Sequence, residues 1–390
     1  MDRKNVFLVA RDAAPSRAFG KLEPVLRESG FGVCLLVGDG KPLDQEQKML
    51  MDAAVAGADC VVLGMSSSEE LAKPEILAGE MARRLGIPYG FYGDVRRCWA
   101  RARTGAWFEK LAPSADFYFG ITKGDADAAG EVFLSAKLFG TGNPLREEMA
   151  FARFTREEVR AKLGVAPNEK LVLAPGGKFA GGNMGQWNVI MDALALLDAG
   201  DHYFQLILST HPGDVTPGAI DAGSLETLKI ENMDGAPLHV PYIDTSGLKL
   251  LNLYEELISF SPVPTRIVGK KDVLTTSDMV PGADIIVEFG SSIGIEGAYQ
   301  NVPVITLGVE TLFQRLEKMN GSRVLEAVED GLSELVERAD AEKLAYQIAK
   351  LLTPSGFAQM SALQKELCPM PAERGAALRK MADAVKIITA

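Results

Sequence analysis

The sequence predicts an α/β protein with two doubly wound, Rossmann-like domains, and three observations support this fold class. The chain has 390 residues, more than one hydrophobic core usually organises. Short apolar runs alternate with longer helical patterns, which is typical of a parallel sheet covered by helices. The same alternation starts again after residue 165, so we expect two domains of one class.

The first domain is expected to span residues 1–150. Its strands are predicted at residues 6–10, 32–37, 60–63, 88–92, 116–121 and 137–139. Helices are predicted between them at about 16–29, 42–56 and 68–85. Gly30 ends the first of these helices, and the turn Gly38-Asp39-Gly40 follows the second strand.

The second domain is expected to span residues 165–365, after a break at Thr141–Pro144 and a helix at 155–163. Its strands are predicted at 170–174, 204–208, 238–240, 266–268, 284–287 and 303–307. Helices are predicted at 339–352 and 372–388, with Pro354, Pro369 and Pro371 between them. Residues 372–390 therefore form a final helix that we expect to cross back onto the first domain.

Composition and charge argue against a function in nucleic-acid binding. Hydrophobic residues make up 47% and charged residues 24% of the chain, an ordinary globular balance. The net charge of -11 repels nucleic-acid phosphates, so we expect no nucleic-acid partner and a local positive site for any anionic ligand.

Cysteine usage indicates a reducing compartment. Cys34, Cys60, Cys98 and Cys368 show no C-x-x-C spacing, and we interpret them as buried free thiols. The apolar run at residues 6–10 is too short for a signal-peptide core or a membrane span. These features predict a cytoplasmic protein.

The strongest candidate site is the segment Ile285–Ala298, in which an apolar strand is followed by Gly290, Ser291 and Ser292 and then by Glu296. Ligands of open α/β sheets bind beyond the carboxyl ends of strands, where helix N-termini offer free N–H groups. Gly290 permits close approach of a phosphate, the serines cap the helix, and Glu296 can accept both hydroxyls of a ribose. The alternative is an ordinary capped helix whose glutamate complements the helix dipole.

Two further candidates follow strands of the second domain. Gly176, Gly177 and Lys178 form a glycine-rich loop with one positive charge, although the Walker spacing is absent. His211 follows another strand directly and is suited to donate to a phosphate or to act as an acid or base. A glycine-rich connection and a loop-capping histidine are the structural alternatives.

The first domain offers charged groups after its own strands. Arg11, Asp12 and Ser16 follow the first strand, and Asp94 follows the fourth. Asp94 is interpreted as a base that deprotonates an acceptor hydroxyl, with a helix-capping aspartate as the alternative.

Arg96 and Arg97 begin an arginine-rich run that continues to Arg103, with Trp107 and Phe108 beyond it. This mixture suits a phosphorylated or lipid-linked acceptor and a peripheral contact with the inner face of the membrane. A solvated helix face is the favoured alternative.

No metal or redox cofactor is expected. The sequence has no H-E-x-x-H, paired C-x-x-C or carboxylate-rich loop, so it offers no dedicated metal site. The fingerprint G-x-G-x-x-G is absent after the first strand, which argues against a nicotinamide enzyme.

The ordered set of these motifs resembles the GT-B superfamily of nucleotide-sugar glycosyltransferases and the related UDP-N-acetylglucosamine 2-epimerases. The motifs are Gly142-Asn143-Pro144, Ala174–Lys178, His211-Pro212 and the run Ala283–Ile305. The resemblance implies two domains facing a cleft. It also implies that the region from Gly290 to Glu296 holds the nucleotide diphosphate and ribose, and that first-domain loops receive a sugar or lipid-linked acceptor.

Departures from the epimerase pattern favour a metal-independent transferase. Its expected donor is a nucleotide sugar such as a UDP-sugar, and its expected setting is the synthesis of cell-envelope polysaccharide. The epimerases usually carry consecutive glutamates in this helix, whereas here Glu296 is followed by Gly297. Epimerisation also requires several placed carboxylates to move protons, and Asp94 is the one well-sited carboxylate. Transfer needs one base, Asp94 or else Asp12, and positive groups such as Lys178 and His211 for the leaving diphosphate. A 2-epimerase and a non-catalytic nucleotide-sugar-binding protein remain the alternatives.

Overall fold

The computed structural model describes residues 3–38, 45–100, 105–177, 180–198, 203–210, 250–269, 272–308, 313–314, 317, 326–337 and 340–390. The chain divides into two compact units. The described residues of unit 1 lie within Met1–Glu148 and Pro371–Ala390, and those of unit 2 lie within Met149–Lys318 and Ser322–Met370.

Unit 1 contains a parallel sheet of six strands in the order β2-β1-β3-β4-β5-β6. The strands are β1 (Asn5–Ala10), β2 (Gly32–Val37), β3 (Cys60–Leu63), β4 (Tyr89–Tyr92), β5 (Phe117–Gly120) and β6 (Lys137–Gly140). The helices are α1 (Ala13–Glu28), α2 (Gln45–Ala56), α3 (Glu69–Leu85), α4 (Gly105–Glu109), α5 (Lys123–Ala128), α6 (Pro144–Met149) and α17 (Ala376–Thr389). Because β2 lies on one side of β1 and β3 on the other, the topological switch point falls between β1 and β3.

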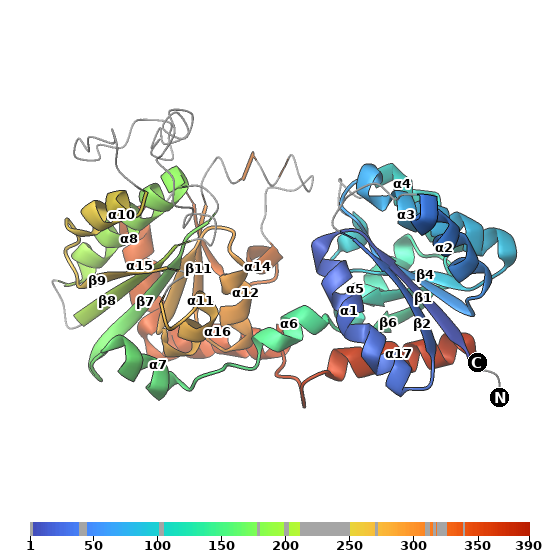
Figure 1. Cartoon of the computed structure of the whole chain (residues 1–390). Coiled ribbons are helices and arrows are strands. Elements are labelled where there is room, and N and C mark those ends of the chain that lie inside the picture. Colours follow the sequence, from blue (N-terminus) through green and yellow to red (C-terminus); the bar gives the residue numbers. More distant parts are fainter. Residues whose placement is uncertain are drawn as a thin grey trace. The chain divides into compact units, whose positions relative to one another are not determined.

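Helices cover both faces of this sheet. On one face, Val6 and Leu8 pack with Phe19 of α1 and Met381 of α17, and the red α17 runs beside the blue α1 in Figure 1. On the other face, apolar residues of α2 and α3 pack against β1, β3 and β4. The C-terminal helix α17 is therefore part of the core of unit 1.

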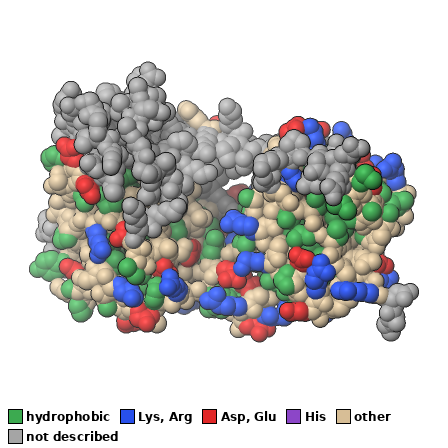
Figure 2. Space-filling model, in the orientation of Figure 1, with side chains coloured by type: hydrophobic (Ala, Val, Ile, Leu, Met, Phe, Trp, Pro, Cys, Tyr) green, Lys and Arg blue, Asp and Glu red, His purple; other side chains and the backbone are tan. Residues whose placement is uncertain are grey.

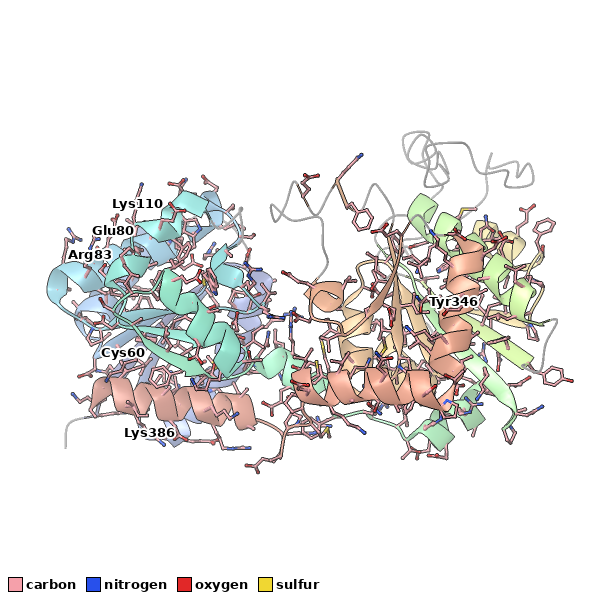
Figure 3. The ribbon with its side chains drawn as sticks, turned by 180° about the vertical axis from the view of Figure 1, so that it is seen from behind. Cys60, Glu80, Arg83, Lys110, Tyr346 and Lys386 are labelled. Carbon is pink, nitrogen blue, oxygen red and sulfur yellow. The ribbon has the colours of Figure 1, made fainter. Side chains whose placement is uncertain are left out.

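The start of α17 is anchored by a buried carboxylate. Glu147 accepts hydrogen bonds from the backbone N–H groups of Ala376 at 2.8 Å and Ala377 at 2.6 Å, which satisfies two of the unpaired donors of that helix end. At the other end, Lys386 lies on the outer side of α17 in Figure 3 and pairs with Asp383 at 2.9 Å.

Unit 2 contains a second parallel sheet, in the order β12-β11-β10-β7-β8-β9. The strands are β7 (Glu169–Pro175), β8 (Tyr203–Ser209), β9 (Thr265–Val268), β10 (Ile285–Glu288), β11 (Val304–Gly308) and β12 (Glu334–Glu337). The helices are α7 (Arg156–Leu163), α8 (Ala180–Asp198), α10 (Leu250–Ile258), α11 (Thr276–Met279), α12 (Ser292–Tyr299), α14 (Glu326–Glu329), α15 (Ala341–Leu352) and α16 (Pro354–Leu367). Here the switch point falls between β7 and β10, and the predicted class of two doubly wound α/β domains is confirmed.

An ion-pair cluster fixes α7 to the sheet of unit 2. Asp284 pairs with Arg156 at 2.6 Å and with Arg160 at 2.9 Å. The same carboxylate accepts the backbone N–H of Leu171 at 2.7 Å. These charge-assisted bonds join the entry helix to β7 and β10, the two strands at the switch point.

The structure corrects several predicted elements. The segment after Pro354 is helix α16, because Pro354 takes the first helical position and Thr353 accepts from Gly356 N at 3.1 Å. Strand β12 was not predicted. The predicted strand at 238–240 lies outside the described residues.

The free cysteines differ from the prediction at one position. Cys60, labelled in Figure 3, is buried in β3, and Cys98 and Cys368 are also buried. Cys34 is exposed, so the prediction of four buried thiols is wrong there. It lies on β2, which is an edge strand, where one face of the strand has less cover.

Candidate functional site

The switch point of unit 2 brings together the two loops predicted to hold a ligand. β7 and β10 are adjacent and parallel, while the chain continues from β7 towards β8 and from β10 towards β11. Ligands of doubly wound sheets bind beyond the carboxyl ends of the strands at such a switch point. Gly176 and Gly177 follow β7, and Gly290, Ser291 and Ser292 follow β10.

The turn after β10 has the geometry of a helix N-terminus that is open to solvent. Gly290 has φ of +79°, a conformation that favours glycine. Ser291 is the N-cap of α12, and its hydroxyl accepts from Ile293 N at 3.3 Å. Gly290 and Ser292 are exposed, so an anion can reach this end of the helix.

A buried carboxylate lies beneath this turn. Glu288, the last residue of β10, is 2% exposed. Its Oε2 accepts from Ser291 N at 2.6 Å, and its Oε1 accepts from Thr306 Oγ1 at 2.5 Å. Burial raises the pKa of Glu288 to about 7. Sequence reasoning missed this residue, and the signal was a glutamate that ends an otherwise apolar strand.

The loop after β7 is closed by an asparagine side chain. Asn183 Oδ1 accepts from Gly177 N at 2.6 Å, and Asn183 Nδ2 donates to Gly177 O at 3.1 Å and to Tyr254 at 3.1 Å. A Cβ on Gly177 would lie 3.0 Å from the ring of Phe289, so the two loops touch. Lys178 lies outside the described residues.

The neighbouring strand β8 ends in hydroxyl groups. Ser209 and Thr276 of α11 are hydrogen-bonded through their side chains, and Thr210 N donates to Val268 O at 2.9 Å. His211, the next residue, lies outside the described residues, so its predicted role stays a prediction.

Glu296 lies on α12, one turn beyond the open N-terminus, and is 8% exposed. Its Oε2 accepts from Ser277 Oγ at 2.8 Å, and its Oε1 faces Gln300 Nε2 at 3.4 Å. Burial raises the pKa of Glu296, while the Ser277 hydrogen bond lowers it. The carboxyl is thus held in place from two sides within unit 2.

Unit 1 places a second polar cluster at its own switch point. Asp12, after β1, accepts from Ser67 N at 2.7 Å, and its own N–H donates to Ser66 Oγ at 3.1 Å. Ser66 Oγ donates to Glu75 at 2.5 Å. The loops after β1 and β3 are therefore tied together, with Asp12 partly exposed.

Glu75 and Arg11 are the buried members of this cluster. Glu75 is fully buried, and Arg11 is 5% exposed. The Arg11 backbone N–H donates to Glu75 Oε1 at 3.3 Å, whereas Glu75 Oε2 has no hydrogen-bond partner in the described part of the chain. Burial raises the pKa of Glu75 to about 8, so the carboxyl is largely neutral at pH 7.

Asp94 is less accessible than the sequence suggested. It is 8% exposed, its Oδ1 contacts Cys98 Sγ at 3.5 Å, and its carbonyl accepts from Asn143 Nδ2 at 2.6 Å. Ser16 donates to Ala10 O at 3.1 Å, which closes the turn after β1. Of these side chains, Asp12 presents the more accessible carboxylate.

The arginines after β4 are exposed, but the aromatic residues beyond them are not. Arg96 and Arg97 are exposed. Arg97 has φ of +51°, and its N–H donates to Asp125 at 2.7 Å. Trp107 and Phe108 are 3% and 2% exposed and pack in the core of unit 1. The mixture of arginines and aromatic rings considered for a lipid-linked acceptor therefore does not form at the surface, because both rings are buried against Phe91 of β4.

Charge and hydropathy of the described residues give no further site. No group of three or more potential metal ligands occurs in the described ranges. No helix among the described elements is long and apolar enough to cross a membrane. On the face seen in Figure 2, Lys and Arg side chains are interspersed with Asp and Glu.

No family model and no curated protein sequence matches the chain. Several solved structures are similar to the chain. A UDP-GlcNAc 2-epimerase from Neisseria meningitidis bound to UDP-GlcNAc has a TM-score of 0.56 and 14% identity, over 98% of this chain and 100% of that one. A glycosyltransferase from Rickettsia africae has a TM-score of 0.53 and 14% identity, over 100% and 99%.

A third similar structure, the HepE protein of Anabaena in complex with UDP, has a TM-score of 0.53 and 12% identity, over 98% and 100% of the two chains. The chain has the GT-B fold. At these identities the likeness concerns the fold alone, and the resemblance inferred from the motifs is confirmed at that level.

Proposed function

We propose that the chain is a glycosyltransferase that moves a sugar from a nucleotide diphosphate sugar to an acceptor hydroxyl. The observation that carries the proposal is the switch point of unit 2, where the glycine loop after β7 touches the capped turn after β10. Switch points of this kind are where doubly wound domains bind nucleotides. The similar structures from Neisseria meningitidis and Anabaena contain UDP-GlcNAc and UDP.

In this proposal the diphosphate lies against the outer side of the turn at Gly290–Ser292, at the N-terminus of α12. The partial positive charge of α12, with Lys178 and His211, stabilises the negative charge that develops on the leaving diphosphate. Glu296 accepts the ribose hydroxyls. A carboxylate offers about four acceptor positions, and its contacts with Ser277 and Gln300 use two of them.

The base that activates the acceptor is assigned to unit 1. A base must touch the proton that it removes, and Asp12 is partly exposed at the switch point whereas Asp94 is 8% exposed. We therefore place Asp12 before Asp94 in this role. Arg96 and Arg97 are proposed to line the acceptor side together with Ser16, and a sugar or lipid-linked acceptor suits these exposed arginines. Arg11 is 5% exposed, so we place it behind them in this role.

A ligand screen followed by product analysis tests the proposal. Melting temperature is measured with UDP-, CDP-, GDP-, ADP- and TDP-sugars, and one nucleotide should raise it, by an increment that grows with ligand concentration. The stabilising donor is then incubated with and without candidate acceptors. Release of nucleotide that depends on an acceptor supports transfer. Formation of an epimeric sugar without an acceptor would replace the proposal by 2-epimerisation, and absence of any stabilising nucleotide sugar would refute both.

A further inference from the structure

The inference concerns Glu288 and rests on the proposed function. Glu288 is the only member of its strand β10 with an ionisable side chain, and it pairs in register with Thr306 of β11. Both of its oxygens are engaged, Oε1 by the Thr306 hydroxyl at 2.5 Å and Oε2 by Ser291 N at 2.6 Å. The Gly290 N–H is a further hydrogen-bond donor to this carboxyl.

The turn proposed to bind the diphosphate is wrapped around this carboxyl. A Cβ placed on Gly294 would lie 3.2 Å from Glu288 Cγ and 3.3 Å from its carboxyl carbon, so the first turn of α12 sits directly on it. The backbone donors of Gly290 and Ser291 thus already serve an anion of the protein itself. A diphosphate on the outer side of the same turn meets a like charge beneath it.

The surroundings of Glu288 accommodate the carboxyl with or without its proton. Thr306 Oγ1 lies 2.6 Å from Ser333 Oγ, and Ser333 Oγ donates to Glu334 O at 3.4 Å. When Glu288 is ionised, Thr306 donates to it. When Glu288 is protonated, its O–H donates to Thr306, Thr306 donates to Ser333, and Ser333 donates to the Glu334 carbonyl. Neither state leaves a buried hydroxyl without a partner.

On the elements packed against Glu288, no described residue places a positive charge that offsets the negative charge of its carboxylate. On α12, Glu296 faces Ser277. On β12, Glu334 pairs with Lys350 at 3.0 Å, and Glu337 is exposed. From α8, Gln186 reaches only the backbone carbonyl of Val287, at 3.2 Å. Within the described part of the chain the carboxyl is therefore compensated by hydrogen bonds alone, and burial raises its pKa to about 7.

We propose that Glu288 sets the affinity of the site for the diphosphate, and that the nucleotide sugar binds preferentially when Glu288 carries a proton. The ionised carboxyl offsets the positive end of α12 and repels the ligand, whereas the neutral acid leaves the helix end positive. Because the pKa is near 7, affinity is full below pH 7 and falls as the pH rises above it. Glu288 acts as a positioning residue, since it touches the turn and not the ligand.

The test is isothermal titration of UDP-N-acetylglucosamine between pH 6 and pH 8. This probe is used instead of UDP because the terminal phosphate of UDP itself titrates near pH 6. For one linked proton with a pKa near 7, the Kd should be about tenfold larger at pH 8 than at pH 6. Titrations at pH 8 in buffers of different ionisation enthalpy should report an uptake of about 0.9 proton on binding.

Glu288→Gln mimics the protonated acid, because its amide oxygen can accept from Ser291 N and its NH₂ can donate to Thr306. The variant should bind the probe at pH 8 about as tightly as the parent does at pH 6, with no pH dependence. Asp192→Asn is the matched control. Asp192 lies on α8 of the same unit, is exposed, and also has a raised pKa, so its variant should keep the parental profile.

The possible results distinguish a failure of the Glu288 proposal from a failure of the proposed function. A pH-independent Kd in the parent, or a parental profile that survives in Glu288→Gln, overturns the inference and leaves the proposed function standing. If no nucleotide sugar of the panel binds at pH 6, the proposed function fails and the inference fails with it. If Glu288→Gln does not fold, the parent protein is titrated over the same pH range with uridine, which lacks phosphate. Its affinity should not change with pH, and a tenfold change equal to that of the probe would refute the role of the diphosphate.

Discussion

Replacing Glu296 with alanine tests the assignment of the ribose site. The Glu296 carboxyl is fixed by Ser277 at 2.8 Å, and Gln300 lies 3.4 Å away, so the remaining lone pairs have a defined direction. Hydrogen bonds to a charged group contribute about 1.5–3 kcal/mol. Loss of the ribose contacts should therefore raise the Kd of the nucleotide sugar by about 10- to 150-fold, measured by isothermal titration.

Ser277→Ala is the control for this variant. It removes the internal donor to Glu296 and leaves the carboxylate in place, so we expect the Kd to change less than about threefold. Circular dichroism must show that both variants are folded. An unchanged Kd in Glu296→Ala would refute the ribose assignment. An equal loss in the two variants would show that Glu296 only holds α11 and α12 together.

Three further predictions address the base, the buried Glu75 and the partly buried Asp284. Asp12→Asn should lower transferase turnover about a hundredfold, the effect of a lost general base, and Asp94→Asn less, with the reverse order contradicting our assignment. Glu75→Gln should flatten the pH dependence of stability. Because the pKa of Glu75 is raised from 4.5 to about 8, the folded chain binds more protons than the unfolded chain between about pH 4.5 and pH 8. Stability should therefore fall with rising pH by up to about 1.4 kcal/mol per unit, and an equal slope in urea titrations of parent and variant would refute this. Asp284→Ala should destabilise unit 2 by about 3–5 kcal/mol, because it leaves Arg160 partly buried without its carboxylate, and a loss below about 1 kcal/mol in urea unfolding would count against this reasoning.

The strands and the capped turn after β10 were predictable because they depend on local patterns. The apolar run Ile285–Val287 followed by Gly290 and Ser291 specifies a strand, a tight turn and a capped helix. The periodicity of residues 372–388 likewise identified the final helix, which begins four residues later, at Ala376. These features use only neighbouring residues in the chain.

The rest depended on contacts between distant residues. Pro354 was interpreted as a break between helices, yet it begins α16 because Thr353 caps that helix. Glu75 and Glu288 were not singled out, since their raised pKa values come from the strands and loops that bury them. The preference for Asp12 over Asp94 also follows from exposure, which the sequence pattern does not report.

The central claim is that the switch point between β7 and β10 binds a nucleotide diphosphate sugar. The most direct measurement is a crystal structure of the chain with the nucleotide sugar selected by the melting-temperature screen. The account predicts the diphosphate within hydrogen-bonding distance of the Ser292 N–H at the start of α12, with the ribose hydroxyls on Glu296. A diphosphate bound away from this turn, or a ribose without contact to Glu296, would contradict it.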